Sequence, residues 1–332
     1  MTLTASALRA CAYSGEADLE AIAHLINTCR TADKLPPECQ VFVSDLKEEF
    51  EDPDFDPHQD THLWRDASGK LVAYADCWKH EPEGEFVVGF SFEIHPHVRN
   101  ERLEHEILRW AEQRLRDMGR ESQLPLVLHT GCRDTRRSRQ QLFSHLGFSP
   151  IRHFFRLKRS LQEPIPESGL PAGWKFRCVD AATEAESWLG MFNQSFVDHW
   201  NYQPLTLESF RYYTSLSTYN PDLDLVIETE QGELVTFCAA EIDEKRNASL
   251  NRKEGYIGLL GTRRGFRRRG LARALLLEGL RKLQAAGMET AKIGVDSENP
   301  SGALGLYQSV GFEQELSSTV FRKAVFRKAV AR

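Results

Sequence analysis

Arg267-Arg268-Arg269-Gly270-Leu271-Ala272 is the stretch that decides the fold, because it describes a loop that closes around an anion and then becomes a helix. Residues 256–261, before it, have the pattern of a strand, and residues 271–286 carry apolar side chains at helical spacing. The loop therefore lies at a helix N-terminus, where free backbone N–H groups and the positive end of the dipole attract phosphate. Gly270 permits close backbone approach, Ala272 keeps the first turn narrow, and the arginines add cationic donors. The stretch predicts a pyrophosphate site.

A second motif lies downstream at a suitable spacing. Residues 292–296 have the pattern of a strand, a turn begins at Asn299, and residues 303–310 form a predicted short helix closed by Gly311-Phe312. On its own the first motif also fits a basic, solvated helix cap. Together the two motifs resemble the GNAT (GCN5-related N-acetyltransferase) superfamily, whose acetyl-CoA loop is written Arg/Gln-x-x-Gly-x-Gly/Ala. Its members typically continue with a strand, an asparagine, a helix carrying Leu-Tyr (here Leu306-Tyr307), and Gly-Phe.

Length and composition predict a cytoplasmic protein of two domains. The chain has 332 residues, and a hydrophobic content of 41% can furnish substantial cores. A net charge of −6 argues against nonspecific nucleic-acid binding, whereas the basic segment 263–269 suits a small anionic ligand. The seven cysteines are scattered without metal-ligand spacing, which predicts reduced thiols and no metal site. No apolar run approaches a membrane span, no secretion signal is recognisable, and the sequence indicates no oligomeric state.

An internal duplication accounts for the length of the chain. Residues 69–73 parallel residues 232–236, and residues 144–148 parallel residues 309–312, so that both halves end alike. A segment rich in Pro and Gly separates the halves and has the composition of a linker. We therefore predict two similar folds in tandem: a first domain at residues 1–161, a linker at residues 162–172 and a second domain at residues 173–332.

The first copy keeps the framework of the loop motif but loses its phosphate chemistry. Residues 99–104 are in register with the loop and place Arg102 at the position of Gly270. The glutamates of this segment complement the helix dipole internally and repel a pyrophosphate. Phe143 stands near the position of Tyr307, so the tyrosine is missing as well. We predict that the first domain is a GNAT-like partner domain without catalytic activity.

The resemblance implies an α/β fold of two tandem GNAT-like domains, each a mixed, mostly antiparallel sheet flanked by helices. In such domains a central strand pair splays apart where the pantetheine arm of the coenzyme enters. In the second half the residue pattern predicts strands at 175–178, 223–228, 234–241 and 317–325 and helices at 182–196 and 205–216.

The resemblance also assigns an acetyl-CoA site. Backbone groups of Leu259, Leu260 and Gly261 are expected to bind the acetyl group and the pantetheine. Asn299 matches a position that usually hydrogen-bonds the coenzyme, although a plain turn residue would look the same. The pyrophosphate is expected on the loop, at Arg267, Arg268, Arg269, Gly270, Leu271 and Ala272.

Acetyl transfer requires a neutral amine, donors for the oxyanion and a proton for the leaving thiolate. In the superfamily the tyrosine of the Leu-Tyr pair lies near the coenzyme sulfur, so Tyr307 is the expected thiolate acid; a half-buried core tyrosine is the alternative. Glu241, at the end of a predicted strand, is the first candidate for the general base, against an ordinary solvated glutamate. His199 is the second candidate. It lies beside Trp200 in a loop that walls the acceptor site in the family, although a lone histidine is more often structural.

A degenerate first domain joined to an intact second one is similar to the mycothiol synthase group, including the run Asn193, Phe196 and His199. The resemblance implies an acetyl-CoA-dependent N-acetyltransferase that acts on the primary amine of a small molecule by direct attack in a ternary complex. A protein or peptide amine acetyltransferase would use the same coenzyme site, and another acyl donor is open. A non-catalytic sensor or scaffold that binds coenzyme A would keep Gly270 but need no base.

Overall fold

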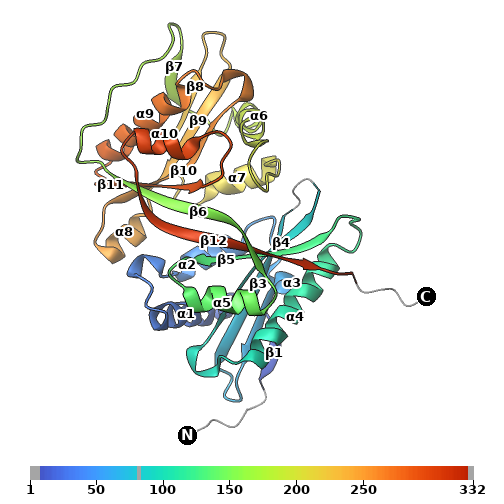
Figure 1. Ribbon diagram of the computed structural model, residues 1–332. Helices are drawn as coiled ribbons and strands as arrows, with labels where there is room; N and C mark the ends of the chain where they lie inside the picture. Colours follow the sequence, from blue (N-terminus) through green and yellow to red (C-terminus); the bar gives the residue numbers. More distant parts are fainter. Residues whose placement is uncertain (1–7, 81–83, 328–332) are drawn as a thin grey trace. The chain divides into compact units, whose positions relative to one another are not determined.

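The computed structural model describes residues 8–80 and 84–327, and the chain divides into two compact units (Figure 1). Unit 1 comprises residues 1–151 and 319–332, and unit 2 comprises residues 152–318. These limits differ from the predicted division at residues 162–172. The difference arises because the last strand of each half belongs mainly to the unit formed by the other half.

Unit 1 contains a sheet in the order β1-β2-β3-β4-β5-β12. Strands β1 to β4 pair antiparallel, each with the next, and β4 pairs parallel with β5. Its last strand is the C-terminal part of β12 (Glu313–Val325). The other elements are β1 (Arg9–Ala12), α1 (Ala17–Ala32), the 3-10 helix η1 (Pro37–Cys39), α2 (Val43–Phe50), α3 (Pro57–Asp60), β2 (Thr61–Arg65), β3 (Leu71–His80), β4 (Phe86–Ile94), η2 (Pro96–Val98), α4 (Glu101–Met118), β5 (Leu126–Arg133) and α5 (Arg137–His145).

Unit 2 repeats this element order, with a sheet in the order β6-β11-β10-β9-β8-β7. The parallel pair is β10 with β11, and β6 joins the sheet antiparallel to β11. Its elements are β6 (Ser149–Ser160), β7 (Lys175–Cys178), α6 (Ala185–Phe196), α7 (Leu207–Ser215), η3 (Pro221–Leu223), β8 (Asp224–Glu228), β9 (Leu234–Glu241), α8 (Glu244–Leu250), β10 (Glu254–Thr262), η4 (Arg264–Phe266), α9 (Leu271–Ala285), β11 (Thr290–Asp296), α10 (Ala303–Ser309) and the first part of β12.

The repeated order and the mixed sheets confirm the predicted architecture of two similar α/β halves in tandem. Strands β7 and β9 have the predicted bounds, and α9 ends one residue earlier than predicted. Helix α6 begins at Ala185, three residues after the predicted start. Helix α8 was not predicted; it buries no side chain, so it lacks the apolar stripe by which a packed helix is recognised.

Alternation along the strands of unit 2 produces a core on each face of its sheet. Leu225 and Ile227 of β8 pack with the leucines of α9 on one face, whereas Val226 packs with Trp188 of α6 on the other. Helix α9 alone buries eight residues, including six leucines with no exposed surface or almost none. Since each buried leucine contributes roughly 1.5–3 kcal/mol, this helix is firmly held against the sheet.

The centre of the sheet in unit 2 opens between β10 and β11. The two strands pair only over Glu254–Ile257 and Thr290–Ile293, although both continue further. A bulge in β10 falls at Gly258, where the pairing with β9 skips from Ile257 to Leu259. A bulge bends its strand and increases the local twist. The strands diverge after it, and the functional pocket lies at this point.

Candidate active site

A pocket of about 1080 Å³ opens where β10 and β11 diverge, and all its lining residues belong to unit 2. Its walls come from β6, β10, β11, the loop after α6, and the start of α9 and of α10. Most of the predicted site residues converge here, namely His199, Leu259, Leu260, Gly261, Arg267, Arg268, Gly270, Leu271, Ala272, Asn299 and Tyr307. Arg269, Trp200 and Glu241 are not among the lining residues.

The predicted phosphate loop ends at Gly270, which is the N-cap residue of α9. Its φ of 77° lies in the left-handed region, and no atom lies within 4 Å of the place where a Cβ would stand. No side chain caps this helix, so no capping side chain accepts a hydrogen bond from the N–H groups of its first turn. A helix N-terminus in this state attracts an anion.

The three consecutive arginines have different surroundings. Arg267 is engaged by the protein, since its guanidinium donates to the carbonyl oxygen of Thr262 (3.1 Å), the carboxylate of Asp198 (2.7 Å) and the carbonyl oxygen of Ser195 (2.8 Å). Its side chain therefore anchors the loop. Arg269 donates to the carbonyl oxygen of Gly265 (3.2 Å) and lies outside the pocket lining.

Arg268 lines the pocket, is exposed, and has a left-handed backbone (φ 62°). A pocket residue that sequence reasoning missed, Arg273, lies one turn into α9. Within the described residues, neither arginine has an ion pair or hydrogen bond to another side chain or carbonyl. These two guanidinium groups are therefore available to an anionic ligand at the helix N-terminus.

Asp198 holds the loop to the end of α6. Its carboxylate accepts from Arg264 (3.0 Å for one contact) and from Arg267 (2.7 Å). Hydrogen bonds from Arg264 and then Arg267 hold the pKa of Asp198 well below its ordinary value. The carboxylate thus balances two of the basic residues around the loop and leaves Arg268 without a counter-charge.

Tyr307 of α10 lies in the pocket wall with an exposed fraction of 6%. Burial, followed by the neighbouring Cys238 and Tyr256, raises the pKa of its phenol well above the ordinary value. Among the described residues its hydroxyl has no hydrogen-bond partner, and its ring contacts Phe312 at a centroid distance of 6.1 Å. The side chain presents a protonated hydroxyl to the pocket.

Asn299 forms a turn at the pocket edge. Its side-chain oxygen accepts from the backbone N–H (2.9 Å) and the hydroxyl (2.6 Å) of Ser301. This is the plain turn residue that the sequence allowed, and only its amide NH₂ is left for a ligand.

Glu241 stands at the end of β9, directly opposite Tyr256 of β10. Its carboxylate lies over Gly258, because a Cβ built there would come within 2.9 Å of its Oε1 atom. Burial raises its pKa above the ordinary value of 4.5. No hydrogen bond or ion pair to this carboxylate occurs within the part of the chain that the structure describes. The glycine at the bulge provides the space in which the carboxylate sits beside the pocket.

The loop after α6 contributes His199 to the pocket but not Trp200. The ring of His199 lies 5.1 Å from that of Phe196, and the indole of Trp200 contacts Phe154 at 5.8 Å. The guanidinium of Arg152 lies 5.3 Å from the Trp200 ring. Trp200 therefore packs on the wall that Phe154 forms.

Within residues 8–80 and 84–327, no three His, Cys, Asp or Glu side chains are grouped so that they could hold a metal ion. In the same residues, no helix has the length and hydropathy of a membrane span.

Comparison with known proteins connects this geometry to a family. Residues 185–312, which include α6, the loop, Gly270 and Tyr307, match the family model described as acetyltransferase (GNAT) family. The chain carries a GNAT domain. The mycothiol acetyltransferase of Thermobispora bispora is 28% identical over 186 residues, which are 55% of this chain and 61% of that protein. The chain thus matches about three fifths of the length of this curated relative.

Solved structures share the fold over the whole chain. A GCN5-related N-acetyltransferase from Sphaerobacter thermophilus superposes with a TM-score of 0.75 at 24% identity and covers 96% of each chain. A tandem GNAT protein from the clavulanic acid biosynthesis pathway gives a TM-score of 0.69 at 13% identity, over 97% of this chain and all of the other. These similarities show that both halves have the GNAT fold.

Three side chains of unit 2 escaped sequence reasoning because the sheet brings them to the pocket from distant segments. Tyr256 of β10 lies opposite Glu241 on the neighbouring strand β9, and Arg156 of β6 lies opposite Gly294 of β11. Phe154 lies on the same side of β6 as Arg156. Only the strand register shows these neighbours, whereas Arg273 had a local signal as a basic residue in the first turn after Gly270.

Proposed function

We propose that the GNAT domain of unit 2 transfers an acetyl group from acetyl-CoA to the primary amine of a small molecule by direct attack in a ternary complex. One observation carries the proposal: a helix N-terminus open to an anion and a protonated phenol without a protein partner face the same pocket. The similarity to the mycothiol acetyltransferase of Thermobispora bispora supports a small-molecule amine as the acceptor.

The residues present fit acetyl-CoA. Left-handed Gly270, with free space around it, gives a diphosphate access to the first turn of α9, and Arg268 and Arg273 stand beside it without counter-charges. The diverging β10 offers unpaired backbone groups at Leu259–Gly261 on the side that β11 has left. A pantetheine arm hydrogen-bonds such a strand edge as an added strand would. When bound, the coenzyme supplies an activated acyl thioester.

Tyr307 is the proposed proton donor to the sulfur. Because burial raises the pKa of its phenol, the hydroxyl keeps its proton at neutral pH. A thiolate is a better leaving group when a nearby acid protonates it. The absence of an internal acceptor for this hydroxyl, within the described residues, is consistent with a ligand atom as its partner.

Glu241 is the proposed proton acceptor for the amine. Its carboxylate lies against the bulge in β10 at Gly258, within one or two residues of the strand edge proposed for the acyl group. Burial raises its pKa toward the range in which a carboxylate removes a proton effectively. His199 lines the acceptor side of the pocket and is proposed to contact the substrate there.

Unit 1 is proposed to be a non-catalytic partner. The N-terminus of α4 is capped by Asn100, whose side chain accepts from the N–H of Leu103 (3.0 Å), so the anion site is occupied by the protein itself. The predicted alignment placed Arg102 at the position of Gly270, but the structure puts Asn100 there. The loop before α4 has six residues whereas that before α9 has eight.

The test combines calorimetric titration with acetyl-CoA and an assay of thiol release over a panel of amines. Tyr307→Phe is expected to keep coenzyme affinity within about twofold while thiol release falls about 10- to 100-fold. If the protein binds acetyl-CoA but releases no thiol with any amine, the proposal of an enzyme is wrong and the alternative of a non-catalytic coenzyme A sensor takes its place. Thiol release with peptide amines alone would favour a protein or peptide acetyltransferase. A preference for a thioester with a longer acyl chain would mean that the acyl donor is not acetyl-CoA.

A further inference from the structure

The strand register of unit 2 places a row of functional side chains on one face of the sheet. Glu241 of β9 lies opposite Tyr256 of β10, and Arg156 of β6 lies opposite Gly294 of β11. The Tyr256 hydroxyl lies 2.8 Å from the position of a Cβ on Gly294, so the tyrosine reaches across β11 toward β6. Leu157, the neighbour of Arg156, is buried on the α9 face, which puts Arg156 on the opposite face with Glu241.

Arg156 is a cation without a counter-charge in the pocket wall. Other basic residues of β6 have partners: Arg152 binds Asp296 (2.7 Å), Lys158 lies 3.8 Å from Glu315, and Arg159 donates to the carbonyl oxygen of Pro164 (3.0 Å). In the part of the chain that the structure describes, no carboxylate or carbonyl oxygen accepts from Arg156. A half-buried guanidinium of this kind favours an anionic ligand.

The coenzyme phosphates do not explain this cation. The phosphate loop follows Thr262 of β10. Arg156 is level with Gly258, because its partner Gly294 lies two residues beyond Lys292, which pairs with Tyr256. Arg156 is therefore four residues, about 13 Å, short of Thr262 along the strand direction and two strands away from β10. The end of the coenzyme that reaches toward Tyr256 is the uncharged acyl thioester. An anion near Arg156 must therefore belong to the acceptor.

Opposite charges flank Tyr256. Burial raises the pKa of its phenol, Arg156 lowers it, and Glu241 raises it, so both charged groups act on this one hydroxyl, Glu241 from the neighbouring strand β9 and Arg156 from β6, beyond β11. The backbones of Glu241 and Arg156 are separated by three strand spacings and by two residues along the strands, about 16 Å in all, and their side chains shorten the gap. This space suits one small molecule with an amine at one end and an anion at the other.

We infer that the acceptor of the GNAT domain is an amine that also bears a carboxylate or phosphate, bound by Arg156 while the amine faces Glu241. The inference rests on the proposed acetyl transfer and names its substrate class. Phe154 and His199 line the same side of the pocket, so an aromatic or apolar portion of the acceptor has surface to contact.

Matched ligand pairs that differ only in the anion test the inference. Phenylalanine is compared with phenylalaninamide, and phosphoethanolamine with ethanolamine, in calorimetric titrations of the protein saturated with coenzyme A and in thiol-release assays with acetyl-CoA. The full-length protein is expected to prefer the anionic member of at least one pair by about 10- to 100-fold. The pair that shows the preference identifies the anion as carboxylate or phosphate.

Arg156→Gln is expected to abolish that preference while leaving the affinity for acetyl-CoA and for the neutral member unchanged. Lys158→Gln is the matched control, since it removes a cation from the same face of the same strand outside the pocket lining, and its preference should equal that of the parent. Equal affinity of the parent for both members of both pairs, or a preference that survives Arg156→Gln, would overturn the inference.

The two assays separate this inference from the proposed function. If the proposed acetyl transfer is wrong, no amine causes thiol release. The calorimetric preference for the anionic ligand over the neutral one can still be measured in that case. Preference for the anion in calorimetry, lost in Arg156→Gln, supports the assignment of Arg156 whether or not acetyl transfer is observed. If thiol is released but neither ligand pair shows a preference for the anion, the assignment of Arg156 is wrong while the proposed acetyl transfer stands.

Discussion

The loops before α4 and α9 are held by the same contacts, yet only one of them is open to an anion. Arg99 donates to the carbonyl oxygen of Ile94 (3.1 Å), the last residue of β4, and Arg267 donates at the same distance to that of Thr262, the last residue of β10. Each arginine also binds an aspartate just beyond the first α-helix of its unit, Asp33 after α1 and Asp198 after α6. Asn100 then caps α4, whereas Gly270 leaves α9 uncapped.

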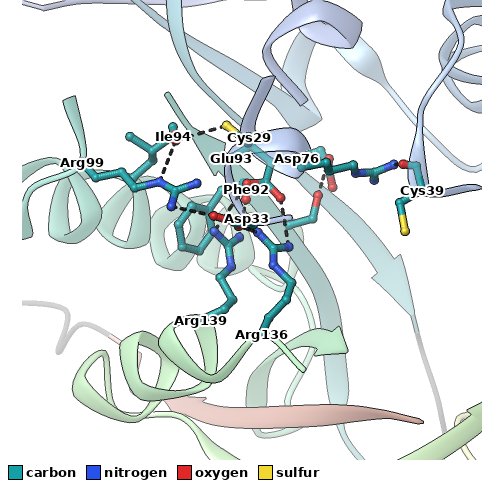
Figure 2. A network of polar contacts seen from close by, with 12 residues as sticks. Cys29, Asp33, Cys39, Asp76, Phe92, Glu93, Ile94, Arg99, Arg136 and Arg139 are labelled. Atoms are coloured by element: carbon teal, nitrogen blue, oxygen red, sulfur yellow. Dashed lines mark hydrogen bonds and ion pairs between the residues drawn. The ribbon is translucent and has the colours of Figure 1, made fainter. Parts of the chain in front are cut away.

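The splayed strand pairs differ in the same way. In unit 1, β4 and β5 pair over Phe86–Gly89 and Leu126–His129 and then diverge, but Arg139 of α5 fills the space. Its guanidinium donates to the carbonyl oxygen of Phe92 in β4, lies 3.9 Å from the centre of the Phe92 ring, and is 3.7 Å from Glu93. Figure 2 shows Arg139 and Arg136 pointing from α5 toward Glu93 and Asp33.

The comparison separates scaffold from chemistry. The anchoring arginine occurs in both units, so it stabilises the loop and is no mark of coenzyme binding by itself. Phe143 takes the place of Tyr307: each accepts, through its carbonyl oxygen, from the N–H of the phenylalanine that follows the glycine. Trp78, opposite Gly89 in β4, stands where unit 2 has Glu241. Unit 1 therefore keeps the frame and lacks the groups that move protons.

Gly270→Glu should remove the difference between the two helix N-termini, because it places a carboxylate at the N-cap of α9, the position that Asn100 occupies in α4. A side chain at φ 77° is strained, and its charge would repel the phosphates, so affinity for acetyl-CoA should fall by at least about 100-fold in calorimetry. Gly287→Glu is the control, since that glycine has a similar φ of 83° beyond the other end of the same helix. If the two variants bind equally well, the loop is not the phosphate site.

Arg139→Ala tests the filled splay in unit 1. Removing this buried guanidinium leaves Glu93 without one of its cations and opens a space beside Phe92, so the free energy of unfolding should fall by about 3 kcal/mol in urea titrations. Arg137→Ala, at an exposed position two residues earlier, at the start of the same helix, should change it by less than about 0.5 kcal/mol. A second acetyl-CoA site in the Arg139 variant would mean that the arginine alone excludes the coenzyme.

Local patterns predicted most elements because each reports on its own neighbours. The strand at residues 175–178 and the helix that begins at Leu271 were correct, since alternation and apolar spacing follow from burial of one face. The exchange of β6 and β12 between the units was not predicted. Both halves end in similar strands, and the local sequence does not specify which sheet such a strand completes.

The candidate site divides in the same manner. Gly270 and Tyr307 were found because short motifs hold their spacing, and Glu241 because it ends a clear strand. Arg156 became visible only when β6 was seen to pair with β11, a contact between residues more than 130 positions apart. The filled splay in unit 1 was also missed, since Arg139 gave no sign of burial in the sequence.

A pH profile sharpens the contrast between Glu241 and its unit 1 counterpart, Trp78, which cannot titrate. The carboxylate must be deprotonated to accept a proton, and burial raises its pKa, so the acid limb of kcat/KM should lie at a pH above the ordinary value of 4.5. Glu241→Gln should lower kcat/KM about 100-fold at neutral pH and remove that limb, with acetyl-CoA affinity unchanged. A limb that persists in the variant would transfer the role to another group, and His199 is the next to test.

The smallest expected effect distinguishes two adjacent arginines whose sequence environment is the same. Arg268 lines the pocket with no partner among the described residues, so Arg268→Ala should weaken acetyl-CoA binding about 10-fold by removing a charged donor to the phosphates. The guanidinium of Arg269 instead donates to Gly265 and lies 5.4 Å from the ring of Phe266, outside the lining. Arg269→Ala should therefore change the affinity by less than about threefold. Equal losses in the two variants would show that the coenzyme reaches further around the loop than Gly270 and the start of α9 indicate.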